Sequence, residues 1–198
     1  MSAQLHLLFP TPIYVDNIGV DFEISTVRQY VDADGGLISR DQDCLLENRK
    51  LKEEVDRHTE YYLRDHLHLN KSVGLKHQCS WILLTDKGGY SPRHFHSNSW
   101  LTGIYYFHVT ETSGDLEFEH DPPNWCAGNM DPSKQIEEYN MINSTSITFR
   151  PGPGDLYLFP SHLHHSATRN NSSEQRICLP FNYSLCGEWG SLTKSMTA

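Results

Sequence analysis

The latter part of the chain is divided into many short runs of apolar or alternating residues, and this pattern limits the fold more than any other feature. The runs lie after Lys76, and turn-forming Gly, Pro, Asn and Asp residues separate them. Period-two alternation places apolar side chains on one face of a strand, and several short strands at this spacing are typical of a sandwich or barrel. We expect strands at residues 79–85, 90–96, 101–109, 115–119, 146–149, 155–159, 165–168 and 176–185.

The preceding part of the chain has a different pattern. Apolar residues recur at helical spacing in residues 21–32 and 43–69, with charged residues between them, which predicts two amphipathic helices packed on a sheet. Earlier still, the two prolines within residues 5–14 exclude a helix and allow only an edge strand. We therefore expect one domain over residues 1–198, with helical support at about 20–70 and an antiparallel β core at about 76–186.

Composition excludes several classes of function. The formal net charge is −9, from 25 acidic and 16 basic residues, and no basic run could follow a phosphate backbone. The chain starts without a secretion-signal pattern and has no apolar stretch long enough to span a bilayer. Its five cysteines form no paired spacing, which is typical of a reducing compartment. We expect a soluble cytoplasmic protein that binds neither nucleic acid nor a membrane; a homodimer remains open.

Histidine is concentrated in two places. His94 and His96 are separated by one residue on a predicted strand, so both side chains point to the same face. This pair alone fits a polar surface face equally well. A second group ends at His165, after a turn and a short strand, and could supply a third imidazole from across the barrel. Three such ligands on one side of a metal leave positions open for substrate or oxygen.

Arg176 opens the last predicted strand, eleven residues after His165. Its planar guanidinium can bind a carboxylate through two parallel hydrogen bonds. By itself it is best interpreted as a surface arginine that is either paired with Glu174 or unpaired. Together with the histidines, it favours a buried arginine that faces the metal cavity.

Four segments occur in a specific order: YSPRHFH at residues 90–96, TGIYYF at 102–107, GDLYLFPSHLHH at 154–165 and RICLPFN at 176–182. Their combined spacing resembles the 2-oxoglutarate/iron(II) oxygenase superfamily. Within it, the chain is similar to a bacterial and phage group of 2OG-Fe(II) oxygenases and, more distantly, to prolyl 4-hydroxylases. The segment LFPTPIY at residues 8–14 also resembles the usual beginning of that group, so the resemblance covers nearly the whole chain.

The resemblance implies a double-stranded β-helix, or jelly-roll, core that binds one iron(II), with 2-oxoglutarate and O2 as co-substrates. His94 and His165 would be metal ligands, and Arg176 would bind the distal carboxylate of 2-oxoglutarate. Tyr106 would donate a hydrogen bond to the same carboxylate; the alternative is a core aromatic, as expected of Tyr105. No catalytic side chain beyond the metal site is implied.

The sequence departs from the superfamily at His96, where most members have a carboxylate. A neutral imidazole there leaves the site with about one more positive charge. Asp115 or Glu117, on a neighbouring predicted strand, could supply the carboxylate instead, but His96 ranks first because its position matches. His162 and His164 have no ligand role in the pattern and are expected at the rim.

The expected activity is a dioxygenase reaction that hydroxylates a C–H bond and releases succinate and CO2. The substrate would be a peptide or a small molecule, with a peptidyl proline as one candidate, and the loop at residues 120–145, which contains Trp125, would cover the mouth of the cavity. A cupin would share the barrel, but residues 97–101 lack the glutamate of its first motif. A non-catalytic jelly-roll module that binds metal is the other alternative.

Overall fold

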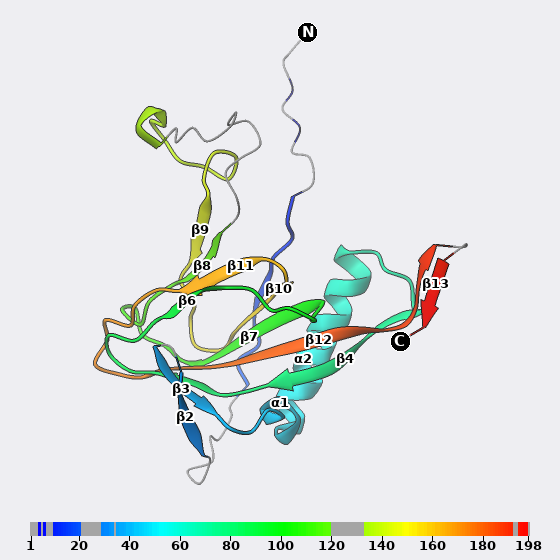
Figure 1. Ribbon diagram of the computed structural model, residues 1–198, viewed down its shortest axis with the longest axis horizontal. Coiled ribbons are helices and arrows are strands. Elements are labelled where there is room, and N and C mark those ends of the chain that lie inside the picture. Colours follow the sequence, from blue (N-terminus) through cyan, green and yellow to red (C-terminus); the bar gives the residue numbers. More distant parts are fainter. Residues whose placement is uncertain are drawn as a thin grey trace.

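Two antiparallel sheets form the core of the computed structural model, which describes residues 4, 6, 10–20, 29–33, 35–119, 133–191 and 194–197. In Figure 1 the smaller sheet lies above most of the larger one. The larger sheet has the order β1 (Tyr14–Asn17), β10 (Asp155–Pro160), β7 (Leu101–His108), β12 (Arg176–Ser191), β5 (Leu83–Thr85), β3 (Gly36–Ser39), β2 (Tyr30–Ala33), and β4 (Val73–Ser80) and β13 (Lys194–Thr197) also pair with β12. The smaller sheet has the order β6 (Ser91–His94), β11 (His164–Ala167), β8 (Leu116–Glu119), β9 (Ser146–Phe149).

The central strands β7, β10 and β12 are covered on both faces, because their alternate side chains enter two separate hydrophobic clusters. One set packs with the helices: Leu101, Tyr105, Leu156, Leu158, Leu179, Phe181 and Tyr183. The other set faces the smaller sheet: Ile104, Tyr106, Tyr157, Phe159 and Cys178. Period-two geometry separates these faces. The inner one, between the sheets, is where the polar residues discussed below are located.

The helical layer consists of α1 (Cys44–Glu47), α2 (Arg49–Tyr61) and a π-helical turn (Tyr62–His66). Asn48 separates α1 from α2, and its side-chain oxygen accepts a 3.0 Å hydrogen bond from the Leu51 amide as an N-cap. Leu51 and Val55, four residues apart on α2, are fully buried against the larger sheet. A short 3₁₀ turn (Ser133–Gln135) lies before β9.

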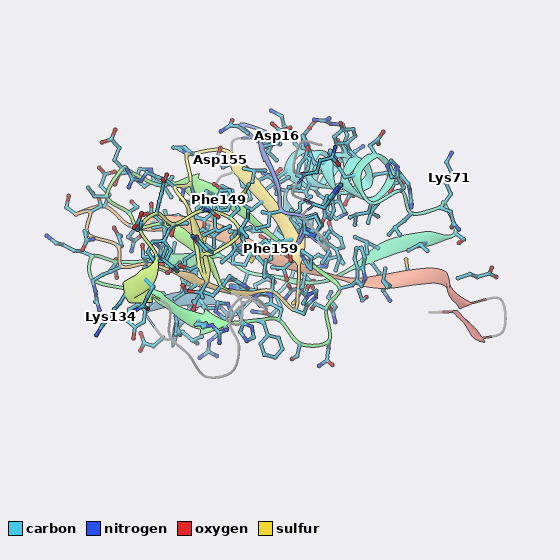
Figure 2. All side chains as sticks on the ribbon, turned by 90° about the horizontal axis from the view of Figure 1, so that it is seen from above. Asp16, Lys71, Lys134, Phe149, Asp155 and Phe159 are labelled. Atoms are coloured by element: carbon cyan, nitrogen blue, oxygen red, sulfur yellow. The ribbon has the colours of Figure 1, made fainter. Side chains whose placement is uncertain are left out.

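Aromatic side chains fill the space between the two sheets. The Phe118 ring lies edge-on to Phe149 and to Phe159, with centroids 5.8 and 4.8 Å away. Figure 2 shows Phe149 and Phe159 near the middle of the molecule, whereas Lys71 and Lys134 lie toward its opposite ends. The aromatic packing therefore forms one wall of the space that holds the candidate site.

The expected fold class is confirmed: helices lie on one side of a mainly antiparallel β structure with the double-stranded β-helix arrangement. The expected edge strand begins at Tyr14 and pairs with β10; residues 5 and 7–9 lie outside the described residues. The expected helix at 43–69 is present in three pieces. Strand 79–85 is two strands, since β4 ends at Ser80 and β5 begins at Leu83.

The helix predicted at residues 21–32 is wrong in the part that the structure describes. Residues 30–32 were expected to end a helix, but they lie in β2, which forms a hairpin with β3 and pairs Asp32 with Leu37. Cross-strand pairing supplies backbone partners that the apolar spacing alone does not indicate. Residues 21–28 of this predicted helix lie outside the described residues. Within the described part of the chain, no helix is long and apolar enough to cross a membrane.

Candidate metal centre

Three of the twelve histidines meet at one point between the sheets. One possible ligand nitrogen from each of His94, His96 and His165 lies within 4.8 Å of the other two. His94 ends β6 and lies directly opposite His165 on β11. The third imidazole therefore comes from the neighbouring strand of the same sheet, and not from across the barrel as expected.

His96 lies just beyond β6 but continues its direction. Its backbone N–H donates a 2.9 Å hydrogen bond to the Ser161 carbonyl, and its ring lies 5.3 Å from that of His94 at an interplanar angle of 24°. The two side chains thus occupy the same face, as the i, i+2 spacing predicts.

Each of the three imidazoles uses Nδ1 in a hydrogen bond to a carbonyl oxygen. His94 Nδ1 donates to Pro92 O at 2.7 Å and His165 Nδ1 to Leu163 O at 2.9 Å. His96 Nδ1 donates to the side-chain Oδ1 of Asn182 at 2.6 Å. A carbonyl oxygen can only accept, so each Nδ1 carries the proton and each Nε2 keeps its lone pair for a metal.

The protonation state suits metal binding. Burial lowers the pKa of His165 to about 3, and burial also lowers the pKa of His96, although its hydrogen bond to Asn182 opposes that shift. Both rings are neutral near pH 7 and need to release no proton to bind a metal. His94 is exposed, which leaves one side of the group accessible from solvent.

The three histidines and Arg176 line one cavity, which has a volume of about 310 Å³. Arg176 begins β12 and is 1% exposed. Its Nη1 donates to the carbonyls of Ser113, at 2.8 Å, and Thr168, at 3.0 Å, while its buried Nη2 has no hydrogen-bond partner among the described residues. A buried guanidinium nitrogen without an acceptor is costly, and a ligand carboxylate in the cavity would satisfy it.

Tyr106 lines the same cavity from β7. Burial, followed by the neighbouring Cys178, raises the pKa of Tyr106 well above its usual range, so its hydroxyl keeps its proton and can donate a hydrogen bond. Tyr105 points to the opposite face, where its hydroxyl donates to the Val20 carbonyl at 2.6 Å. The structure thus separates the two tyrosines as the resemblance implies.

Neither alternative carboxylate joins the histidine group as the described residues place it. Asp115 forms a 3.1 Å ion pair with Arg150. Glu117 lies between Leu116 and Phe118, which are buried in the inner cluster, so alternation directs Glu117 to the other face. Of the residues considered for the third position, His96 is the one that the structure places there.

Other residues singled out in the sequence lie away from the cavity. His162 is exposed and His164 packs its ring against Phe95 at 5.0 Å, and neither is among the residues that line the cavity. Arg93, which precedes His94 in the chain, pairs with Glu119 at 3.1 Å and is also not among the lining residues. The expected covering loop at residues 120–145 lies partly outside the described residues, which do not include residues 120–132 and so do not include Trp125.

Sequence reasoning missed a buried polar group behind His96, made by Asn182, Thr102 and Ser161. Asn182 is 86 residues from His96, so no local motif connects them. The one available signal was alternation along β12, which places residue 182 on the same face as Arg176.

A family model described as "Putative 2OG-Fe(II) oxygenase" matches residues 79–182. This range contains the three histidines, Tyr106, Arg176 and Asn182. No curated protein sequence gives a significant match to the chain.

Several solved structures share the fold. The α-ketoglutarate-dependent epimerase SnoN of nogalamycin biosynthesis aligns with a TM-score of 0.54 and 15% identity, over 82% of this chain and 70% of that chain. HygX from Streptomyces hygroscopicus, solved with nickel and 2-oxoglutarate bound, aligns with a TM-score of 0.54 and 13% identity, over 88% and 83%. An oxidoreductase of the 2OG-Fe(II) oxygenase family from Burkholderia pseudomallei gives 0.50 and 13%, over 89% and 72%.

At these identities the solved structures show a common fold and nothing finer. The three histidines have the donor set and tautomers that fit iron(II), and the Nη2 of Arg176, without a partner among the described residues, fits a carboxylate in the same cavity. Because the family model matches residues 79–182, more than half of the 198 residues, this chain belongs to the 2OG-Fe(II) oxygenase family.

Proposed function

We propose that the protein is an iron(II)- and 2-oxoglutarate-dependent dioxygenase that hydroxylates a C–H bond of its substrate and releases succinate and CO2. His94, His96 and His165 would hold the metal through Nε2. The iron and its co-substrates supply the oxidising chemistry when bound. The protein's own residues bind and orient the reactants and exclude water.

One observation carries the proposal: a three-histidine group and a buried guanidinium with an unused donor line the same cavity. A metal site alone is compatible with many proteins. An arginine that lines the cavity, with a buried Nη2 that has no acceptor among the described residues, favours a ligand with a carboxylate. Tyr106, on the same wall, adds a second donor for that group.

The charge of the cavity supports an anionic co-substrate. Arg176 is the one permanently charged side chain among the described lining residues, which include no carboxylate. With three neutral imidazoles, a bound iron(II) would raise the formal charge to about three positive units. The two carboxylates of 2-oxoglutarate offset two of these units.

The remaining walls are apolar and include Ile38, Trp81, Leu83, Ile104 and Leu116. Such walls keep water from the reacting centre and strengthen the electrostatic interactions inside it. The expected covering loop at residues 120–145 would contribute to substrate choice. A peptidyl proline stays one prediction among peptide and small-molecule substrates, because a shared fold does not fix the substrate.

The proposal is tested by succinate release from the purified protein with iron(II), ascorbate, 2-oxoglutarate and oxygen. Uncoupled turnover of 2-oxoglutarate is expected without a primary substrate, and panels of proline-containing peptides and small metabolites should increase it. The His165→Ala variant is the control, since it removes the most buried ligand. Its activity should fall to the background of the metal-free assay.

An anaerobic titration with iron(II) and 2-oxoglutarate separates catalysis from simple metal binding. The proposed enzyme should develop a weak visible charge-transfer band only when both are present. A non-catalytic metal-binding module would bind iron(II), give no such band and release no succinate. That pair of results would refute the proposed activity.

A further inference from the structure

A chain of buried hydrogen bonds lies behind His96. Asn182 Oδ1 accepts from His96 Nδ1 at 2.6 Å and from Thr102 Oγ1 at 2.9 Å. Thr102 Oγ1 also lies 2.9 Å from Ser161 Oγ. Thr102 and Ser161 are fully buried and Asn182 is 6% exposed. The three residues come from β7, from the segment after β10 and from β12.

His96 differs from the other two histidines in what orients it. His94 and His165 each donate Nδ1–H to the backbone carbonyl two residues earlier, so the local backbone orients them. His96 donates to a side chain of the larger sheet, 86 residues away. Of the three imidazoles, His96 is the one whose Nδ1 acceptor is a side chain, and a substitution can remove a side-chain acceptor but not a backbone carbonyl.

The oxygen end of the Asn182 amide faces His96. The Thr102 hydroxyl donates to Oδ1 at 2.9 Å, and the amide Nδ2 lies 3.5 Å from Cys79 Sγ. With the oxygen toward the ring, His96 must carry its proton on Nδ1. Its Nε2 then carries no proton and keeps a lone pair with which it can bind a metal together with the other two histidines.

We propose that Asn182 is the positioning residue that allows His96 to serve as the third metal ligand, at the place where most relatives are expected to use a carboxylate. It acts through His96 and does not touch the metal. The inference rests on the proposed metal site. A neutral acceptor on the opposite sheet, with Thr102 behind it, keeps the third ligand in one tautomer and orientation.

The test is a metal titration that needs no turnover. The metal-free protein is titrated with cobalt(II) without oxygen, and the dissociation constant is read from the visible absorption of the bound ion. Loss of a hydrogen-bond partner behind a metal ligand typically weakens metal binding by about 10- to 100-fold. Asn182→Ala is expected in that range. Thr102→Val removes a hydroxyl that donates to Asn182 Oδ1 at 2.9 Å and lies 3.3 Å from His96 Nδ1. Because Asn182 Oδ1 remains as the closer acceptor, this variant should cause a smaller loss.

The conservative variant gives the opposite expectation. Asn182→Asp keeps the acceptor oxygens and adds a negative charge behind a neutral ligand, so cobalt(II) should bind at least as tightly as in the parent protein. The visible spectrum of the Asn182→Asp complex should keep the intensity of the parent, as expected for an unchanged ligand set. Binding as weak as that of Asn182→Ala would contradict the proposed role.

A double-mutant cycle separates this role from general destabilisation. If Asn182 acts through His96, the Asn182→Ala change should alter cobalt affinity by less than about threefold in a His96→Ala background. Asn170 is the matched control, because it is a fully buried asparagine whose amide bonds to the Thr85 and Glu174 carbonyls, away from the histidines. Asn170→Ala should lower thermal stability and leave the cobalt affinity unchanged.

The outcomes distinguish the two proposals. A parent protein with no affinity for cobalt(II) would overturn the metal site itself. A parent that binds cobalt(II), together with an Asn182→Ala variant that binds it equally well, would overturn only the role of Asn182. An undiminished effect of Asn182→Ala in the His96→Ala background would do the same.

Discussion

At the scale of single residues, the site is defined by which hydrogen-bonding groups are used and which are left unused. The three imidazoles use Nδ1 internally and keep Nε2, and Arg176 uses Nη1 on two backbone carbonyls while Nη2 stays unpartnered within the described structure. Since buried polar groups in proteins are almost always hydrogen-bonded, the unused groups indicate where ligands bind.

Substitution of Arg176 should weaken co-substrate binding without removing the metal. Loss of one partner of a buried, charge-assisted pair costs roughly 2 to 5 kcal/mol, because the carboxylate is left unpaired. Arg176→Ala should therefore raise the dissociation constant of 2-oxoglutarate by about 30-fold or more. Arg176→Lys keeps the charge and loses the planar fork, so its affinity should be intermediate. Anaerobic calorimetric titration of the metal-loaded variants measures this.

Arg150 is the matched control for this prediction, since its side chain is 66% exposed and paired with Asp115. Arg150→Ala should bind 2-oxoglutarate like the parent protein. Equal affinity in the parent and in Arg176→Ala would remove Arg176 from the co-substrate site.

At the scale of elements, strand β12 contributes side chains both to the hydrophobic core and to the candidate site. Its residues 179, 181 and 183 pack toward the helices, while Arg176, Cys178 and Pro180 line the cavity from the other face. The pairing partner β7 follows the same division, with Tyr105 on the helical face and Tyr106 in the cavity. A shift of either strand by one residue would exchange the two faces.

Gly103 holds these two strands in close contact on the helical face. It lies opposite Phe181 in the β7–β12 register, and a Cβ added to it would lie 2.0 Å from Cζ of the Phe181 ring. Gly103→Ala should lower the free energy of unfolding by about 1 to 3 kcal/mol through overpacking, measured by urea denaturation. The double variant Gly103→Ala with Phe181→Leu should recover part of the loss.

Gly152 provides the comparison for Gly103. An added Cβ there would approach nothing closer than Asp155 Oδ2 at 3.4 Å. Gly152→Ala should change the free energy of unfolding by less than about 0.5 kcal/mol. If both glycine variants were equally stable, the close fit of β7 against Phe181 would not be a constraint on the fold.

At the scale of the whole molecule, buried histidines make stability depend on pH. Burial lowers the pKa values of His58, His77, His96 and His165, the last to about 3. In the unfolded chain these groups titrate near 6.5. Below about pH 6.5 the unfolded state therefore binds more protons than the folded state. The contribution of these neutral histidines to stability is full above about pH 6.5 and decreases as the pH falls, and that of His165 decreases down to about pH 3.

The contribution of one group can be isolated with His165→Phe, a change that suits the aromatic contacts of this ring with Phe118 and Phe159. Denaturation of the metal-free protein between pH 6.5 and pH 4.5 should show a smaller loss of stability in the variant. The difference should be at most about 1.4 kcal/mol per pH unit. Identical pH dependence in the two proteins would mean that His165 is not buried in its neutral form in solution.

The sequence by itself determined a β core preceded by a helical layer and the placement of two candidate ligands on one face, because these follow from local regularities. The finer fold class and the candidate roles of Arg176 and Tyr106 came from the resemblance of several motifs in order. Period-two alternation indicated the strands of the β core, helical spacing indicated the layer at residues 43–69, and the i, i+2 spacing placed His94 and His96 on one face. Residue type supplied the chemistry, since imidazole nitrogen suits iron and a guanidinium suits a carboxylate.

Only the tertiary structure decided what depends on contacts between distant segments. It assigned residues 30–32 to a strand, placed Asp115 and Glu117 outside the histidine group, and brought Asn182 against His96 across 86 residues. These outcomes depend on which strands pair and in what register. Strand pairing is settled by burial and by the hydrogen-bonding needs of the whole chain, and no short window of sequence contains that information.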